Sequence, residues 1–173
     1  MRSTLARPPG LAAACLAAAC LAVGLAACGG SAAHQAPGAA TLKRVIDGDT
    51  IDVLVDGREE RVRLLGIDTP ETKVEGQPPE CYGPEAAMFT ASLLPVGTAL
   101  RLTRDVVGRD DYGRILAYVY RSEDGLLVNE ALLREGYAQP LTIAPNGAMA
   151  GRFVDAAIAA EAAGVGLWTA CAG

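Results

Sequence analysis

Histidine is almost absent from this 173-residue chain, and the single one, His34, lies in a small-residue segment with no helix or strand pattern. We therefore expect neither a histidine base nor a histidine metal ligand. Basic residues are also scarce, with 15 Lys and Arg against 20 Asp and Glu, for a formal charge of −5. Such a chain lacks the broad positive surface of tight non-specific nucleic-acid binders. A local basic cleft, or a divalent cation that bridges acidic protein and acidic ligand, stays compatible with this composition.

Residues 1–27 have the pattern of an export signal rather than of a folded element. Arg2 and Arg7 precede an apolar run from Leu11 to Ala27, which is typical of a signal peptide. The run ends in Leu-Ala-Ala-Cys, which resembles the bacterial lipoprotein box, so we predict lipidation at Cys28 and a membrane-anchored domain facing the periplasm or cell exterior. An ordinary cleavage site and an uncleaved membrane anchor are the alternatives.

The segment 28–40 is small, polar and interrupted by Pro and Gly, as expected for a flexible tether. The folded domain is predicted at 41–171, long enough for one core and without internal repeats. Cys81 and Cys171 are the two cysteines of this domain. In an exported protein they predict one disulfide, and two unpaired buried thiols are the alternative.

The patterning of the domain predicts an α+β fold. An Asp-Gly pair at 56–57, flanked by alternating segments, indicates a two-residue hairpin. Pro84 stands at the first position of a helical pattern, and glycines follow two later ones. Five strands with a helix inserted after the third suit a five-stranded OB-type Greek-key β-barrel with three α-helices. Strands are predicted at 41–46, 50–56, 58–67, 98–107 and 113–120, and helices at 83–94, 126–136 and 147–164.

The hairpin also brings polar residues together. A two-residue turn pairs Val55 with Arg58, so Thr50 lies opposite Arg63, and Asp49 lies at the same end of the ladder. Asp68 follows a few residues beyond that end. Two carboxylates and an arginine therefore converge at one end of the hairpin.

This combination fits phosphodiester hydrolysis. Two carboxylates and a backbone carbonyl suit a hard cation such as Ca²⁺ or Mg²⁺. Arg63 is a bidentate donor for phosphate oxygens, and Glu71, held by Pro70, can orient or deprotonate a water. The reaction needs a cation, positively charged groups beside the phosphoryl oxygens and a positioned water.

The motifs VIDGDT, RLLGIDTPET, YGPEA, DDYGRILAYVY and VNEALLREG resemble the thermonuclease (staphylococcal nuclease) family, in its order and over about residues 41–168. The resemblance implies a calcium-dependent nuclease that cleaves DNA and RNA at the 5′ P–O bond and leaves 3′-phosphate ends. By motif position Asp49, Asp68 and the Thr69 carbonyl correspond to the calcium ligands and Glu71 to the general base.

The resemblance assigns two arginines, Arg63 and Arg114, to the phosphate and catalysis, and we add Tyr112 as a candidate substrate contact. All six catalytic and metal positions carry the family residue. The family carries tyrosines against the bound nucleotide where this chain reads PLTIAPNG, so we expect Thr142 and Ala144 there and weaker base contacts.

A second hypothesis is a non-catalytic OB-fold module that binds single-stranded nucleic acid or a partner protein, and a third is a cell-surface interaction lipoprotein. Non-catalytic relatives typically lose carboxylates or arginines of the array, whereas this chain keeps them all. We therefore expect an exported nuclease that acts on DNA and RNA, preferably single-stranded, as a monomer.

Overall fold

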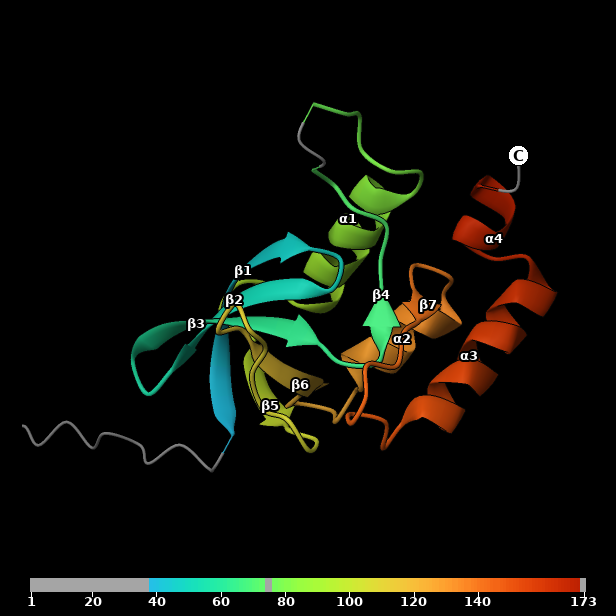
Figure 1. Ribbon diagram of the computed structural model, residues 1–173. Coiled ribbons are helices and arrows are strands. Elements are labelled where there is room, and N and C mark those ends of the chain that lie inside the picture. The colour runs from blue at the N-terminus through green and yellow to red at the C-terminus, as the bar shows by residue number, and fades with distance from the viewer. Residues whose placement is uncertain (1–37, 74–75, 172–173) are drawn as a thin grey trace, which may run out of the picture. The chain divides into compact units, whose positions relative to one another are not determined.

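The computed structural model describes residues 38–73 and 76–171, and its centre is a closed β-barrel (Figure 1). The strands follow the order β1-β2-β3-β6-β5 around the barrel, in which β3 and β6 are parallel and the other neighbours antiparallel. The predicted α+β class and five-stranded OB-type barrel are confirmed. The barrel strands are β1 (Ala39–Asp47), β2 (Thr50–Val55), β3 (Arg58–Leu64), β5 (Ala99–Thr103) and β6 (Ile115–Arg121); the other elements are β4 (Ile67–Asp68), α1 (Gly83–Leu93), α2 (Val128–Arg134), β7 (Gln139–Pro140), α3 (Ala150–Ala163) and α4 (Leu167–Ala170).

The β2–β3 hairpin has the predicted register. Asp56 and Gly57 both have positive φ, 50° and 76°, as a type I′ turn requires. Val55 pairs with Arg58 and Thr50 with Arg63. The turn chemistry thus fixes which side chains reach the far end of the ladder.

The core fills the barrel and the space under the helices. Alternate residues of the barrel strands point inward, and Ile51, Val53, Val62 and Val119 are fully buried. Burial of such side chains stabilises the fold by about 2 kcal/mol each. Phe153 of α3 joins this core and packs edge-on against Tyr118.

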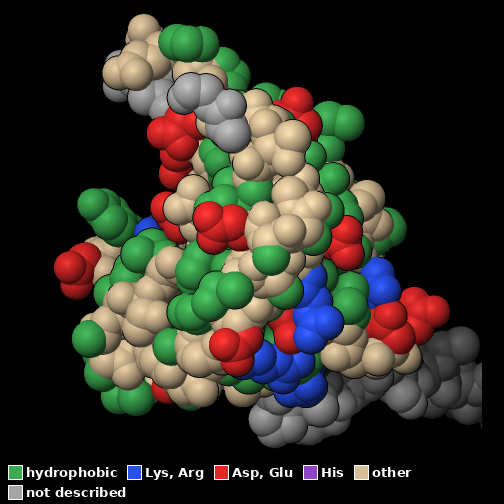
Figure 2. Space-filling view, turned by 90° about the vertical axis from the view of Figure 1, so that its right-hand side faces the viewer, with side chains coloured by type: hydrophobic (Ala, Val, Ile, Leu, Met, Phe, Trp, Pro, Cys, Tyr) green, Lys and Arg blue, Asp and Glu red, His purple; other side chains and the backbone are tan. Residues whose placement is uncertain are grey.

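The helices α2 and α3 pack against each other, and their outer surface carries mixed charge. Figure 2 shows basic and acidic side chains next to one another on this side of the molecule. Glu130 of α2 pairs with Arg134, one turn later, and with Arg152 of α3. An ion-paired carboxylate thus links the two helices.

The structure differs from the sequence prediction in several details, among them the strand predicted at 58–67, which ends at Leu64. In the part of the chain described there are four helices instead of three, because α4 is a single turn, too short for a periodic pattern. The two-residue strands β4 and β7 pair with each other and were equally too short to predict. The strand β1 starts at Ala39, inside the predicted tether, because Ala39 and Ala40 pair with β5. The strand β5 ends at Thr103 instead of 107.

Cys81 and Cys171 form the predicted disulfide, which ties the C-terminal turn to the segment before α1. The predicted signal segment, Cys28 and most of the predicted tether lie outside the described residues. Within residues 38–73 and 76–171, none of the helices has both the length and the apolarity needed to cross a membrane.

Candidate active site

The candidate site lies at one end of the barrel, where the β1–β2 turn meets the end of β3. The amide of Leu64 donates to the carbonyl of Asp49 at 2.9 Å, which extends the ladder past β2. Thr90 of α1 donates to the carbonyl of Gly48 at 2.6 Å. A Cβ at Gly48 would lie only 2.7–2.8 Å from the side chain of Thr69, so glycine is needed for this close approach. The turn is therefore held against both α1 and the segment after β4.

Asp49 is buried and receives several hydrogen bonds. Its Oδ2 accepts from the amide of Thr69 at 2.9 Å and from its hydroxyl at 3.1 Å, and its Oδ1 accepts from the hydroxyl of Thr50. Burial raises the pKa of Asp49, Arg63 opposes this effect, and the negative charge of Asp68 adds to it. The structure thus brings Asp49 into contact with the amide and hydroxyl of Thr69, with Asp68 close by, and their role as metal ligands stays a prediction.

Arg63 stands between the two predicted metal carboxylates. Its Nη2 lies 2.6 Å from Oδ1 of Asp68 and 3.2 Å from Oδ2 of Asp49. Its Nη1 donates to the carbonyls of Leu64 and Ile67. These four contacts fix the guanidinium group at the end of β3.

Glu71 follows Pro70, and the pKa of its carboxyl group is raised. Its contact with the carboxyl group of Asp47, together with burial and the charges of Asp49 and Asp68, raises the pKa of Glu71 to about 7. Its backbone is held by Glu80. Several carboxyl groups therefore lie close to Glu71.

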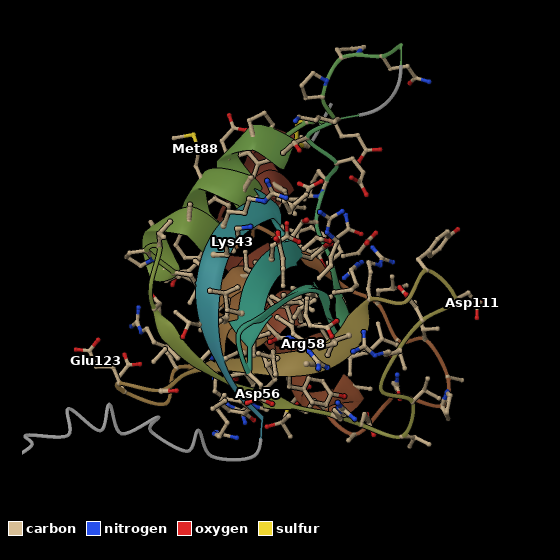
Figure 3. All side chains as sticks on the ribbon, turned by 90° about the vertical axis from the view of Figure 1, so that its left-hand side faces the viewer. Lys43, Asp56, Arg58, Met88, Asp111 and Glu123 are labelled. Carbon is tan, nitrogen blue, oxygen red and sulfur yellow. A yellow bond between two sulfur atoms is a disulfide. The ribbon has the colours of Figure 1, made fainter. Side chains whose placement is uncertain are left out.

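Arg114 comes from the turn before β6 and is held by a residue that sequence reasoning did not single out. Its Nε donates to Oδ2 of Asp110 at 2.6 Å, and its amide donates to Oδ1 of the same carboxylate. Tyr112 is 88% exposed, and its ring lies 5.6 Å from the guanidinium carbon of Arg114. The Asp-Asp-Tyr-Gly-Arg spacing was the available signal for Asp110, since an aspartate four residues before an arginine can pair with it across a tight turn. Figure 3 shows that the loop carrying Asp111 extends from the side of the barrel.

Two hollows meet at Arg114 and Tyr112, which line both. The first, the apolar pocket, has a volume of about 270 Å³ and contains Arg63 and a largely aliphatic wall. The second, the acidic pocket, has a volume of about 320 Å³ and contains Asp47, Glu71 and Arg61. The two predicted arginines and the predicted base thus line two neighbouring pockets that share Arg114 and Tyr112.

The segment in which the family carries tyrosines forms part of the wall of the apolar pocket, and the expectation of weaker base contacts there stays a prediction. Thr142 and Ala144 are exposed and do not line the apolar pocket, whereas Leu141 and Ile143 do. Residues 143–146 form a tight turn, in which the amide of Asn146 donates to the carbonyl of Ile143 at 3.0 Å. The wall is aliphatic at these positions.

The predicted metal ligands have the chemistry that a divalent cation requires. Asp49, Asp68 and the carbonyl of Thr69 are oxygen donors of the kind that hard cations prefer. The contact with Asp47, burial and the charges of Asp49 and Asp68 raise the pKa of Glu71, whereas the pKa of Asp49 is raised chiefly by burial. In the described ranges no three His, Cys, Asp or Glu side chains gather as a metal cluster. The predicted set has two carboxylates, so its chemistry suits a cation. Metal binding by this set stays a prediction.

Comparison with known proteins places the chain in a family. Residues 61–170 match the model described as staphylococcal nuclease homologue. The chain belongs to the staphylococcal nuclease family. Arg63, Asp68, Glu71 and Arg114 lie inside the matched residues, whereas Asp49 precedes them and joins the site through the hairpin.

Proteins similar to this chain include named nucleases. The chain is 45% identical over 105 residues to a thermonuclease of Staphylococcus intermedius, covering 61% of each. It is 44% identical over 103 residues to a thermonuclease of Staphylococcus hyicus, covering 60% of this chain and 59% of the relative. It is 47% identical over 100 residues to endonuclease YncB of Bacillus subtilis (strain 168), covering 57% and 46%. The matches therefore span about half to three fifths of these relatives' length.

Proposed function

We propose that this protein is a calcium-dependent nuclease that hydrolyses phosphodiester bonds of DNA and RNA, preferably single-stranded, at the 5′ P–O bond, leaving 3′-phosphate ends. The observation that carries the proposal is that Arg114 lines both the pocket containing Arg63 and the pocket containing Glu71. A phosphodiester group at this junction has two guanidinium groups and a carboxyl group around it. The names of the similar thermonucleases and endonuclease agree with this chemistry.

Arg63 and Arg114 bind the phosphate oxygens and stabilise the charge that grows on them during displacement. Both are preorganised, Arg63 by two backbone carbonyls and two carboxylates and Arg114 by Asp110. A fixed donor aimed at developing charge is worth about 10²–10³ in rate. Phosphate competes with Asp68 and Asp110 for these guanidinium groups.

Glu71 accepts the proton of the attacking water, or holds that water in line. A base works best when its pKa lies near the operating pH. The crowding of Asp47, Asp49 and Asp68 gives Glu71 a pKa of about 7, so it accepts a proton more readily than an ordinary carboxylate.

Asp49, Asp68 and the carbonyl of Thr69 would hold the calcium ion. When bound, the ion supplies positive charge to a phosphate oxygen and to the crowded carboxylates. Asp49 is oriented for this task by Thr69 and Thr50, whose hydrogen bonds fix its two oxygens. Asp68 pairs with Arg63 at 2.6 Å, so the phosphate-binding arginine is held beside the residues that would hold the ion.

We also propose export, with lipid attachment at Cys28 after removal of residues 1–27, and action as a monomer at the periplasmic or outer cell surface. The disulfide between Cys81 and Cys171 supports an oxidising compartment. Labelling with a radioactive fatty acid, compared between the natural chain and Cys28→Ser, tests the attachment.

The nuclease proposal is tested by incubating the full chain with single-stranded DNA and RNA in calcium or in chelator, followed by analysis of the ends. We expect calcium-dependent cleavage and fragments with 3′-phosphates. Binding of the nucleic acid without cleavage, over a range of pH and calcium, would instead indicate the non-catalytic OB-fold module.

A further inference from the structure

Two arginines outside the family's catalytic array share one buried aspartate on the barrel wall. Asp52 lies on β2, Arg44 on β1 and Arg61 on β3. Oδ2 of Asp52 accepts from Nε and Nη2 of Arg44 at 2.8 and 2.6 Å. Oδ1 accepts from Nε of Arg61 at 2.8 Å, with Nη2 of Arg61 3.2 Å from Oδ2. One carboxylate therefore anchors two guanidinium groups from both neighbouring strands.

The anchor is buried, while the arginines keep an accessible surface. The side chain of Asp52 is 2% exposed, against 55% for Arg44 and 47% for Arg61. The hydrogen bonds from Arg61 and Arg44 lower the pKa of Asp52 against the effect of burial, so it stays ionised at neutral pH. It offsets one of the two positive charges and holds both arginines in place, which reduces the entropy lost when they bind a ligand.

Arg61 connects this pair to the active site. It lines the acidic pocket together with Glu71, Tyr112 and Arg114. It also lines a neighbouring hollow of about 410 Å³, here named the outer cleft. The lining residues of the outer cleft are Asp52, Glu59, Arg61, Tyr112, Gly113 and Arg114.

The outer cleft offers what a further nucleotide of the strand requires. A fixed guanidinium group is a bidentate donor for phosphate, and the exposed ring of Tyr112 at the same cleft is a surface on which a base can stack. Glu59 adds a negative charge at the rim, where it pairs with Lys43. Because the chain has a formal charge of −5, its binding of a polyanion depends on such local positively charged donors.

We propose that Arg61, fixed by Asp52, binds a phosphate of the substrate strand next to the scissile one, and that the outer cleft is a subsite for the flanking nucleotide. The proposal rests on the nuclease function above. It predicts that the enzyme prefers a polynucleotide to a dinucleotide, because the dinucleotide has no second phosphate for Arg61.

The test compares Arg61→Gln with the natural chain on a dinucleotide with one phosphodiester bond and on a longer single-stranded oligonucleotide. We expect KM for the oligonucleotide to rise about tenfold more than KM for the dinucleotide, the loss typical of one charge-assisted hydrogen bond. The slope of log KM against log salt concentration should fall by about one. Arg58→Gln, an exposed arginine at the hairpin end of the same strand, is the matched control and should change neither quantity.

Equal changes on both substrates, or no change on the oligonucleotide, would overturn the subsite. Fluorescence anisotropy of a labelled oligonucleotide keeps the test separate from catalysis. If the natural chain binds but does not cleave, the nuclease proposal fails, while a tenfold weaker affinity of Arg61→Gln would still support the binding subsite. Unchanged affinity in that variant would contradict it.

Discussion

Glu80 and Glu71 hold each other through two hydrogen bonds. The amide of Glu80 donates to the carbonyl of Glu71 at 2.9 Å, and a carboxylate oxygen of Glu80 accepts from the amide of Glu71 at 2.9 Å. A Cβ at Gly83 would lie 2.5 Å from the same carbonyl, so the start of α1 also packs closely here. The candidate base is thus positioned from a segment that adjoins the disulfide at Cys81.

Replacement of Glu80 should impair catalysis more than binding. Glu80→Ala removes the acceptor for the Glu71 amide and loosens the base, so kcat should fall about tenfold, since small misplacement of a catalytic group is costly. KM should change little, because Glu80 is not among the residues that line the two site pockets. Steady-state kinetics on DNA measure both constants. Glu123→Ala, an exposed residue of another loop, is the control; an effect on KM alone would contradict the positioning role.

Reduction of the disulfide should lower both stability and activity. The bond between Cys81 and Cys171 spans 90 residues of sequence, and closing a loop of this size contributes about 4 kcal/mol in the chain-entropy view. Urea unfolding with and without dithiothreitol measures the first effect, and kcat under native conditions the second. In Cys81→Ser the reductant should have no further effect. Full activity of a folded, reduced chain would show that Glu71 does not depend on this link.

An aromatic residue in the wall of the apolar pocket should improve substrate binding. Leu141 and Ile143 line this pocket, and Ile143 is 64% exposed. A tyrosine at position 143 can stack on a base, an interaction worth about 1–3 kcal/mol, so KM for Ile143→Tyr should fall several-fold. Ala144→Tyr, on the neighbouring exposed position, is the matched control. A lower KM in the control and not in Ile143→Tyr would show that position 144, and not position 143, faces the substrate.

The ion pairs between α2 and α3 should make stability depend on pH. Hydrogen bonds from Arg152 and Arg134 lower the pKa of Glu130 from its ordinary value of 4.5. A lowered pKa gives stability that is present above 4.5 and is lost as the pH falls through the folded-state value.

Glu130→Gln should therefore cost about 1 kcal/mol at neutral pH, a modest value because both arginines are more than half exposed. The difference from the natural chain should shrink on acidification below 4.5. Urea unfolding across this range measures it, with exposed Glu161→Gln of α3 as control. A difference that stays constant with pH would exclude the ion pairs as its cause.

The parts of the fold that sequence predicts best are those set by local chemistry. The Asp56-Gly57 turn fixed the register of β2 and β3, and through it the meeting of Asp49 with Arg63. The structure also brings Asp68, Thr69, Glu71 and Arg114 to the same end of the barrel.

Side-chain contacts that depend on how loops and strands pack could not be predicted from the sequence. Glu80 acts through a contact with the backbone of Glu71, nine residues away, which no periodic pattern reports. Asp110 pairs with Arg114 within one turn, where only the spacing of the two residues was a signal. Which of residues 141–144 line the apolar pocket depends on the hydrogen bond of Leu141 to Gly66 and on the tight turn at 143–146, and no periodic pattern in the sequence reports either. The shared anchor Asp52 likewise depends on three strands lying side by side.

The measurement that tests the central claim most directly is calcium-dependent hydrolysis of single-stranded DNA by the full chain, beside Glu71→Gln. The variant keeps the size of the side chain and removes its ability to take a proton, so we predict that kcat falls about 10²-fold or more while unfolding in urea and DNA binding stay close to those of the natural chain. Equal cleavage by the folded variant, or no cleavage by the folded natural chain with calcium, would contradict the account.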